Sequence, residues 1–306
     1  MKKIVGLVVG GWLGWRVFGP EFAPRFEAPQ RHPARLRGRS VFVGEREFFV
    51  REAGNPDGPV LFMLHGWGYA SIATWYRTVE YLGDHFRLIL MDQRNHGGSA
   101  RIRGRFSIDD LADDAAGVMD ALELGRVAVA GYSMGGMVAQ SLARRHPEKV
   151  ASLALGATAA YPIPTRRLAT RVAFAIARGL GRVSLIEWAR ATHGYLLRSG
   201  AVEAEHARWL WEGLLDRDST LSFESGAAVW PFDSREWVSG LDVSSLVIIP
   251  TADQLVPPQR QRELAELLRA EVVELPGAKH EAVLTHGDDI AKAIIEFAGG
   301  SSVGDA

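Results

Sequence analysis

The sequence predicts an α/β protein with a mainly parallel sheet that is covered by helices on both faces. Short apolar runs of the kind found in fully buried strands alternate along the chain with segments of helical periodicity. This alternation favours a doubly wound sheet. About ninety residues also separate two late strands, at residues 150–155 and 245–249, which is more than a simple crossover needs. We therefore expect one core with a helical insertion that forms a cap.

The individual elements can be assigned in chain order. Residues 41–44 and 47–52 are expected to form an opening hairpin. The buried strands are expected at residues 59–64, 86–91, 127–130, 150–155, 245–249 and 271–275. The core helices are expected at residues 107–124, 134–146, 259–270 and 289–298. Ser107 and Asp110 resemble a capping arrangement at the start of the first of these helices, and Pro147 ends the second.

The insertion shows helical periodicity in three segments, residues 168–180, 183–191 and 203–215. It is poor in lysine and rich in large aromatic side chains, namely Trp188, Trp209, Trp211, Trp230 and Phe232. We expect most of these aromatic residues to pack the cap onto the core, and some of them to make the enclosed pocket apolar. The chain thus divides into a leader (1–36), a core (37–160 and 237–298), a cap (161–236) and a flexible tail (299–306).

The most informative motif is G-Y-S-M-G-G at residues 131–136, which ends an apolar run and passes into a helical pattern. A serine hydroxyl is a poor nucleophile unless a base reaches it, so it must stand at a sharp, exposed turn. Gly131 and Gly135 suit such a turn, because a side chain there would collide with the neighbouring strand or helix. The pattern therefore predicts a nucleophile elbow with Ser133 as the nucleophile.

Two further motifs follow buried strands upstream of the elbow. H-G-W-G occupies residues 65–68, and D-Q-R-N-H-G-G-S occupies residues 92–99. With the elbow, these motifs closely resemble the α/β-hydrolase superfamily in kind and in order, and the resemblance runs over residues 37–298. It implies the α/β-hydrolase fold and a catalytic triad in the chain order nucleophile, acid, histidine.

The resemblance places the acid and the histidine after late strands. Asp253 lies in a loop that resembles the acid loop of the family, and His280 ends a P-G-x-x-H loop at residues 276–280. An acid placed one strand earlier would fall in residues 155–160, where no carboxylate occurs. His286 competes with His280, but its position at the start of the last helix favours a structural role. We therefore expect Ser133, Asp253 and His280 to form the triad.

The chemistry implied by this triad is acyl transfer. His280 would take the proton from Ser133 during attack on a carbonyl carbon, and Asp253 would fix the imidazole tautomer. The backbone N–H groups of Trp67 and Met134 would form the oxyanion hole. The side chains expected to line the substrate pocket are those of Trp67, Tyr132, Trp188, Trp209 and Trp230.

Several other polar residues have structural interpretations. His65 precedes the oxyanion loop and is expected to be a buried hydrogen-bonding residue, and Asp92, Arg94 and His96 form a charged cluster at a strand end. The sequence contains no H-E-x-x-H motif, no paired carboxylate cage, no cysteine, no P-loop and no G-x-G-x-x-G after a strand. We therefore expect neither a metal nor a cofactor.

Composition agrees with an enzyme of one domain plus an insertion. The chain has 306 residues, of which 47% are hydrophobic and 23% charged, enough for a full core. A net charge of -1 gives no reason to expect nucleic acid as a partner. The absence of cysteine excludes disulfides and fits either the cytoplasm or the exterior.

The N-terminus combines two lysines with an apolar run of about fifteen residues, which resembles a secretory signal. No A-x-A site follows, and the run is shorter than the ~20 residues that span a bilayer. Residues 1–40 contain eight Lys or Arg against two Glu, a charge excess that suits anionic lipid headgroups. We expect residues 1–18 to make peripheral membrane contact, which places the protein in the cytoplasm or at the cytoplasmic membrane. The alternative is a disordered or packed leader on a cytoplasmic enzyme.

Three functions remain open. The first is a serine hydrolase that cleaves a hydrophobic carboxylic ester or lactone, and the second is an acyltransferase, cofactor-free perhydrolase or C–C bond hydrolase with the same triad. The third is a ligand-sensing member of the fold that turns over weakly. Ser133 argues against haloalkane dehalogenases and epoxide hydrolases, which resemble this family but need an aspartate there.

Overall fold

The computed structural model describes residues 24–26, 29–33, 36–162, 185–216 and 219–301. The expected membrane contact of residues 1–18 and the expected cap helix at residues 168–180 lie outside this part of the chain. In the described residues, no helix is long and apolar enough to cross a bilayer.

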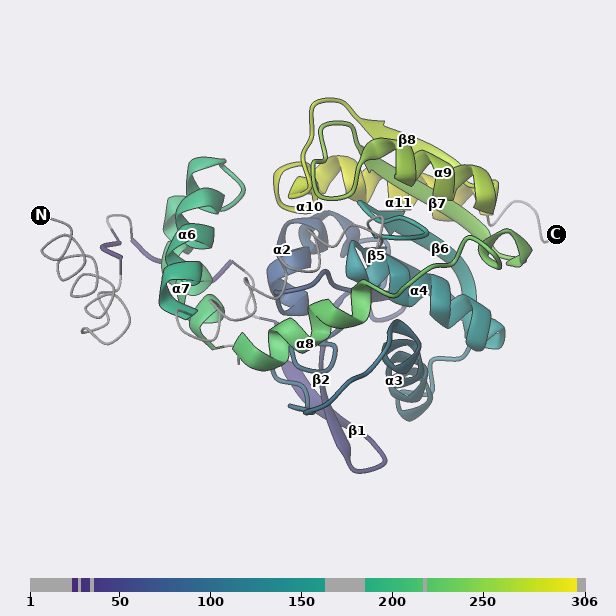
Figure 1. The fold of residues 1–306 in the computed structure, drawn as a ribbon, viewed down its shortest axis with the longest axis horizontal. Coiled ribbons are helices and arrows are strands. Elements are labelled where there is room, and N and C mark those ends of the chain that lie inside the picture. Colours follow the sequence, from purple (N-terminus) through teal and green to yellow (C-terminus); the bar gives the residue numbers. More distant parts are fainter. Residues whose placement is uncertain (1–23, 27–28, 34–35, 163–184, 217–218, 302–306) are drawn as a thin grey trace, which may run out of the picture.

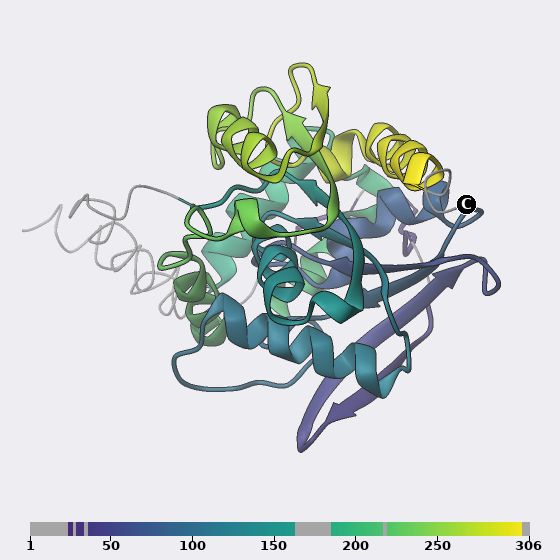
Figure 2. The ribbon, with the colours of Figure 1, turned by 90° about the vertical axis from the view of Figure 1, so that its right-hand side faces the viewer.

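A single eight-stranded sheet forms the centre of the fold (Figure 1). Its strands are β1 (Gly38–Val43), β2 (Arg46–Gly54), β3 (Val60–Leu64), β4 (Arg87–Met91), β5 (Val127–Tyr132), β6 (Val150–Gly156), β7 (Ser244–Pro250) and β8 (Glu271–Leu275). The spatial order is β1-β2-β4-β3-β5-β6-β7-β8. Strand β2 is antiparallel to both of its neighbours, and all the remaining neighbouring pairs are parallel. The expected opening hairpin is β1–β2, which lies at one edge of the sheet (Figure 2).

Helices cover both faces of the sheet, which confirms the predicted fold class. One face is packed by α3 (Ile108–Ala121), α4 (Met134–Arg145) and α9 (Pro258–Leu268). The opposite face is packed by α2 (Ser71–Leu82), α10 (Ala282–Thr285) and α11 (Gly287–Ser301). The capping box predicted for α3 is present, because Ser107 Oγ accepts from the Asp110 N–H and the Asp110 carboxylate accepts from the Ser107 N–H.

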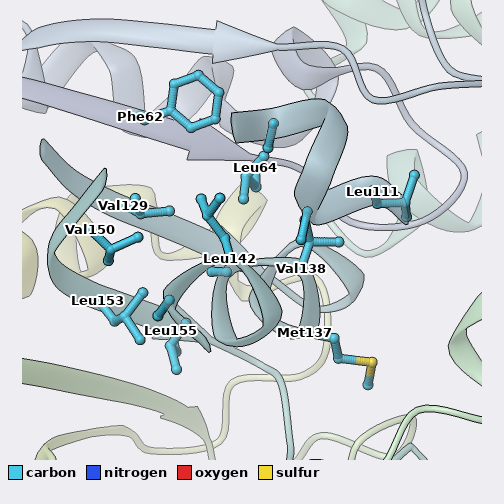
Figure 3. Close-up of a cluster of buried hydrophobic side chains, with 14 of the residues drawn as sticks. Phe62, Leu64, Leu111, Val129, Met137, Val138, Leu142, Val150, Leu153 and Leu155 are labelled. Carbon is cyan, nitrogen blue, oxygen red and sulfur yellow. The ribbon is translucent and has the colours of Figure 1, made fainter. Parts of the chain in front are cut away.

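Alternate residues of the central strands supply the two cores. In β3, Leu61 and Met63 pack toward α2, whereas Phe62 and Leu64 pack toward α3 and α4. Figure 3 shows Phe62 and Leu64 with side chains of β5, β6 and α4 in the second of these cores. A strand sends successive side chains to opposite faces, so a strand covered on both sides must be apolar throughout. This is the physical origin of the apolar runs in the sequence.

The insertion between β6 and β7 contains α6 (Leu185–Arg198), α7 (Ala207–Leu215) and α8 (Ser219–Val229). In Figure 1, α6 and α7 lie to the left of the core, and α8 runs from them toward it. The periodicity of the sequence predicted α7 closely and α6 in part. It did not predict α8, because the sequence S-T-L-S-F-E-S-G-A-A-V has no apolar stripe at helical spacing.

Two paired valines of the sheet provide a test of this packing. Val247 of β7 has 0% of its surface exposed, and its register partner Val272 of the edge strand β8 has 48% exposed. We expect Val247→Ala to lower the free energy of unfolding by about 2 kcal/mol, because it removes buried methyl groups and leaves a cavity. Val272→Ala is the matched control and should cost less than about 1 kcal/mol. Urea unfolding measures both values, and equal losses would contradict the assigned burial.

Candidate active site

Ser133 stands at the sharp turn between β5 and α4. Its backbone has φ 53° and ψ −116°, a left-handed region that a residue with a Cβ rarely adopts. Such a conformation costs on the order of 1–3 kcal/mol and persists only when the surroundings enforce it. The Ser133 N–H donates to Gly156 O (2.9 Å), and Ser133 O accepts from the Gly136 N–H (3.0 Å), so both sides of the turn are fixed.

Glycines allow this turn to pack against the neighbouring strands. A Cβ at Gly135 would lie 2.2 Å from Leu64 O, and a Cβ at Gly131 would lie 2.5 Å from Gly135 O. Both distances are shorter than any real contact, and both neighbours are backbone atoms that cannot swing away. The two glycines of the sequence motif are therefore required by close approach.

Three side chains from distant parts of the chain meet at the carboxyl ends of the strands. His280 Nε2 lies 3.1 Å from Ser133 Oγ, and His280 Nδ1 lies 2.8 Å from Asp253 Oδ2. In this arrangement Nδ1–H donates to the carboxylate, which leaves the Nε2 lone pair for the serine O–H. The structure thus brings together all three residues expected to form the triad.

The loop after β7 holds the Asp253 carboxylate in place. Its Oδ1 accepts from the backbone N–H groups of Leu255 (2.8 Å) and Val256 (2.9 Å), and its Oδ2 accepts from Gln261 Nε2 (3.2 Å). The carboxylate is completely buried, whereas the His280 side chain is 21% exposed and faces the cavity. Fixed donors and burial leave Asp253 with one orientation, in which Oδ2 points at the imidazole.

Tyr132 also reaches the histidine loop. Its hydroxyl donates to the backbone carbonyl of His280 (2.7 Å) and accepts from the Val283 N–H (3.3 Å). Burial raises the pKa of Tyr132 far above its usual value, so the hydroxyl stays a neutral donor. Tyr132 also lies in the lining of the cavity beside Ser133, and its hydroxyl connects the elbow to the His280 loop.

The loop after β3 approaches the nucleophile from the other side. A Cβ at Gly66 would lie 3.5 Å from Ser133 Cβ, so this loop and the elbow are in contact. His65 supports the loop, since its Nδ1 donates to Gly66 O (2.8 Å) and its Nε2 accepts from the Gln93 N–H (2.9 Å). His96 Nε2 accepts from the Gly68 N–H (3.1 Å). Both histidines are therefore buried hydrogen-bonding groups.

The charged cluster after β4 also makes structural contacts. The Asp92 carboxylate accepts from Arg51, from the backbone and hydroxyl of Ser71, and from the Gly98 N–H. Arg94 forms a buried ion pair with Asp114. In the described residues, no group of three or more His, Asp or Glu side chains could hold a metal ion.

A cavity of about 700 Å³ opens beside Ser133 and His280. Its wall is formed mainly by apolar side chains of the core and of the cap, among them Trp67, Met137, Leu196, Val229, Trp230 and Val256. The indole of Trp67 packs against Gly226 of α8, where a Cβ would lie 2.8 Å from the ring. The expected pocket residues Trp67, Tyr132 and Trp230 thus line this cavity, whereas the Trp188 side chain lies outside the described residues.

Trp209 corrects the expectation for the pocket. The structure places it on a different cavity, where its ring lies edge-on to Tyr76 (5.3 Å between centroids) and to His32 (5.6 Å). The direction of a side chain on a cap helix depends on how that helix rotates against the core, and the sequence carries no signal for that rotation.

Sequence reasoning missed two polar residues of the catalytic cavity. Tyr195 of α6 donates from its hydroxyl to Glu281 Oε1 (2.6 Å), and both residues line the cavity. The carboxylate raises the pKa of Tyr195 to about 12. Glu281 could have been predicted as a residue of the cavity because it directly follows His280, but no pattern in the sequence indicates that Tyr195 lies there.

Comparison with known proteins agrees with this architecture. The alpha/beta hydrolase fold family matches residues 59–184. The 2-hydroxymuconate semialdehyde hydrolase of a Pseudomonas species is 28% identical over 88% of this chain and 96% of its own. The pimeloyl-[acyl-carrier protein] methyl ester esterase of Chromobacterium violaceum is 29% identical over 81% of this chain and 96% of its own. The enol-lactonase of Burkholderia xenovorans aligns with a TM-score of 0.74 at 26% identity, over 85% of this chain and all of the lactonase.

The sheet order, the elbow after β5 and these likenesses define the class of the protein. The chain has the α/β-hydrolase fold, and its family match and its relatives lie in the α/β-hydrolase superfamily, as its motifs suggested. Its relatives include hydrolases named for a semialdehyde, a methyl ester and an enol lactone, so the superfamily fixes the fold and leaves the substrate open.

Burial of His65 predicts a pH dependence of stability. Desolvation lowers the pKa of this imidazole below 6.5, so the folded protein keeps it neutral where the unfolded chain protonates it. Below the unfolded pKa, the unfolded state binds the additional proton, and this contribution to stability is lost as the pH falls. We expect the free energy of unfolding to fall less steeply between about pH 7.5 and about pH 5 in His65→Gln than in wild type. Urea unfolding at both pH values checks this, and equal slopes would refute a neutral buried His65.

Proposed function

We propose that the protein is a serine hydrolase that cleaves a carboxylic ester or lactone with a hydrophobic acyl or alcohol part. The observation that carries this proposal is the chain of contacts from Ser133 Oγ through the His280 imidazole to Asp253, at the mouth of an apolar cavity. A hydroxyl, a base and a buried acid in this geometry match the needs of nucleophilic catalysis.

In the proposed mechanism, Ser133 Oγ attacks the carbonyl carbon and His280 Nε2 takes its proton. Asp253 stabilises the imidazolium, and the tetrahedral oxyanion accepts from the N–H groups of Met134 and Trp67. The collapse of this intermediate transfers the proton from His280 to the leaving alcohol and forms an acyl-serine. Water then attacks the acyl carbon and His280 takes its proton. As the acyl–Oγ bond breaks, His280 returns this proton to Ser133 Oγ and the carboxylic acid is released.

The cavity supports a substrate with an apolar part. Val229 at the end of α8, Trp230 directly after it and Met137 from α4 line it together with Ser133. Burial of apolar substrate surface contributes roughly 25 cal/mol per Å² removed from water. A hydrophobic acyl or alcohol group would therefore gain affinity there.

A second candidate is hydrolysis of a carbon–carbon bond beside a ketone. It is favoured by the likeness to the 2-hydroxymuconate semialdehyde hydrolase, which extends over 88% of this chain. The same serine, histidine and aspartate would serve, and only the leaving group would differ. An assay with 2-hydroxymuconate semialdehyde beside the ester series separates the two candidates.

The decisive experiment is covalent labelling by a fluorophosphonate, together with hydrolysis of p-nitrophenyl esters from acetate to palmitate. We expect wild type to be labelled and to hydrolyse at least one ester, and Ser133→Ala to lose labelling and about 10⁶-fold in kcat.

His280→Gln should lose activity to a similar extent. The matched control is His286→Gln, six residues further along, whose ring bonds Thr285 Oγ1 and lies outside the cavity. It should retain activity near that of wild type. Absence of labelling in folded wild type, or equal losses in both histidine variants, would overturn the proposed mechanism.

Tyr132 is a positioning residue in this proposal, because its hydroxyl holds the backbone of His280. Tyr132→Phe removes the hydrogen bond to His280 O, worth about 0.5–1.5 kcal/mol, together with the one from the Val283 N–H, so we expect kcat to fall roughly 2- to 10-fold with little change in KM. The matched control is Tyr76→Phe, which removes a bond from a buried tyrosine to Ala201 O (3.1 Å) away from His280. Both variants should lose stability, but Tyr76→Phe should keep kcat. An equal fall in kcat would assign Tyr132 a general structural role.

A further inference from the structure

A second cavity, of about 560 Å³, lies between the core and the cap, on the other side of the loop that follows β3. The core forms one wall with β2, α2 and the loops after β3 and β4, and the other walls are helix α7 and the segment that precedes β1. It shares Gly68, Tyr69 and Ala73 with the catalytic cavity, so these residues separate the two spaces.

The segment before β1 is fixed on the cap by hydrogen bonds. The Arg31 N–H donates to Glu205 O (2.7 Å), His206 Nδ1 donates to Arg31 O (3.0 Å), and Gln30 Oε1 accepts from the Arg208 N–H (2.9 Å). The ring of His32, which lines the cavity, lies edge-on to Trp209 across a centroid distance of 5.6 Å. This wall of the cavity is therefore built by specific contacts.

One region of the cavity is polar and carries two arginine side chains, one of which is paired with a buried carboxylate. The Arg51 guanidinium lies over the Phe49 ring (4.6 Å) and donates through Nη1 alone, to Asp92 and Ser71, among the described residues. Its side chain is 17% exposed and lines the cavity, and Asp92 already balances its charge, so Arg51 offers hydrogen-bond donors to a ligand without an excess charge. Arg37 adds a second cation to the lining.

The rest of the wall is apolar. Trp209, Leu210 and Leu214 project from α7, opposite Ile72 and Tyr69 of the core. Asp216, at the C-terminal end of α7, is the one acidic residue of the lining against two arginines. A ligand that suits both regions has an apolar body and a head group that accepts hydrogen bonds from the arginines, as a carboxylate does.

We propose that this second cavity binds a small amphipathic carboxylate, with the carboxylate toward Arg51 and Arg37 and the apolar body against Trp209 and Leu214. Because the ligand would touch the core, α7 and the segment before β1 together, it would fasten the cap to the core. The Gly68 N–H bonds His96, which also lines this cavity, so occupancy would act on the wall shared with the catalytic cavity. The proposal does not depend on Ser133 being a nucleophile.

Calorimetric titration of the full-length protein with 4-phenylbutanoate tests the proposal, with 4-phenylbutan-1-ol as the neutral analogue. We expect one site with a sub-millimolar Kd for the carboxylate and binding at least roughly fivefold weaker for the alcohol, since a charge-assisted hydrogen bond adds about 1 kcal/mol or more. The absence of carboxylate binding, or equal binding of the alcohol, would overturn the proposal.

Variants of Gly213 locate the site. Gly213 lies on α7, lines the cavity, and has no atom within 4 Å of an added Cβ, so Gly213→Phe should fill the cavity and weaken binding at least roughly tenfold. Gly213→Ala is the matched control and should bind as wild type does. If Gly213→Phe binds the carboxylate normally, the ligand occupies another site and the proposal fails.

A charge variant gives an independent readout in case Gly213→Phe does not fold. Arg37 is exposed, so Arg37→Glu should leave folding intact while it reverses a charge in the lining. It should weaken binding of 4-phenylbutanoate and leave binding of 4-phenylbutan-1-ol unchanged. Equal effects on both ligands would contradict the proposed orientation of the carboxylate.

Discussion

The left-handed backbone at Ser133 is the constraint on which the rest of the site depends. It is tolerated because Gly135 lies directly against the carbonyl of Leu64 and because Gly156 accepts the Ser133 N–H. These contacts come from β3 and β6, the two strands that flank β5. Ser133 can hold this conformation only where β3, β5 and β6 pair in register. The geometry of the site therefore depends on the pairing of the sheet.

Much of the fold could be predicted because buried parallel strands and sharp turns leave local signals. Strand β3 is apolar at every position, and the elbow needs glycine at positions set by close approach. His280 could be located because its P-G-x-x-H loop, which follows the last strand, resembles the histidine loop of the family. In the folded protein, the apolar strand and the elbow glycines contact neighbouring strands whose positions the order of the sheet fixes.

The parts that could not be predicted depend on contacts between helices. Helix α8 consists largely of small and polar residues, so its sequence shows no apolar stripe at helical spacing. Trp209 does not line the catalytic cavity, because α7 packs its ring against Tyr76. The hydrogen bond from Tyr195 to Glu281 joins residues that are far apart in sequence and whose approach is set only by the packing of the cap. Tertiary packing decides such features, and no local propensity encodes them.

The described helices of the insertion meet the core through side chains and loops, while the sheet continues from β6 directly to β7. The hydrogen-bonded ladder that supports Ser133 is thus independent of the residues that cover it. Changes in the sequence of the insertion therefore leave the strand pairing beneath Ser133 in place. Laboratory recombination between members of the superfamily could exploit the same junctions, at the ends of β6 and the start of β7, to transfer substrate preference between scaffolds.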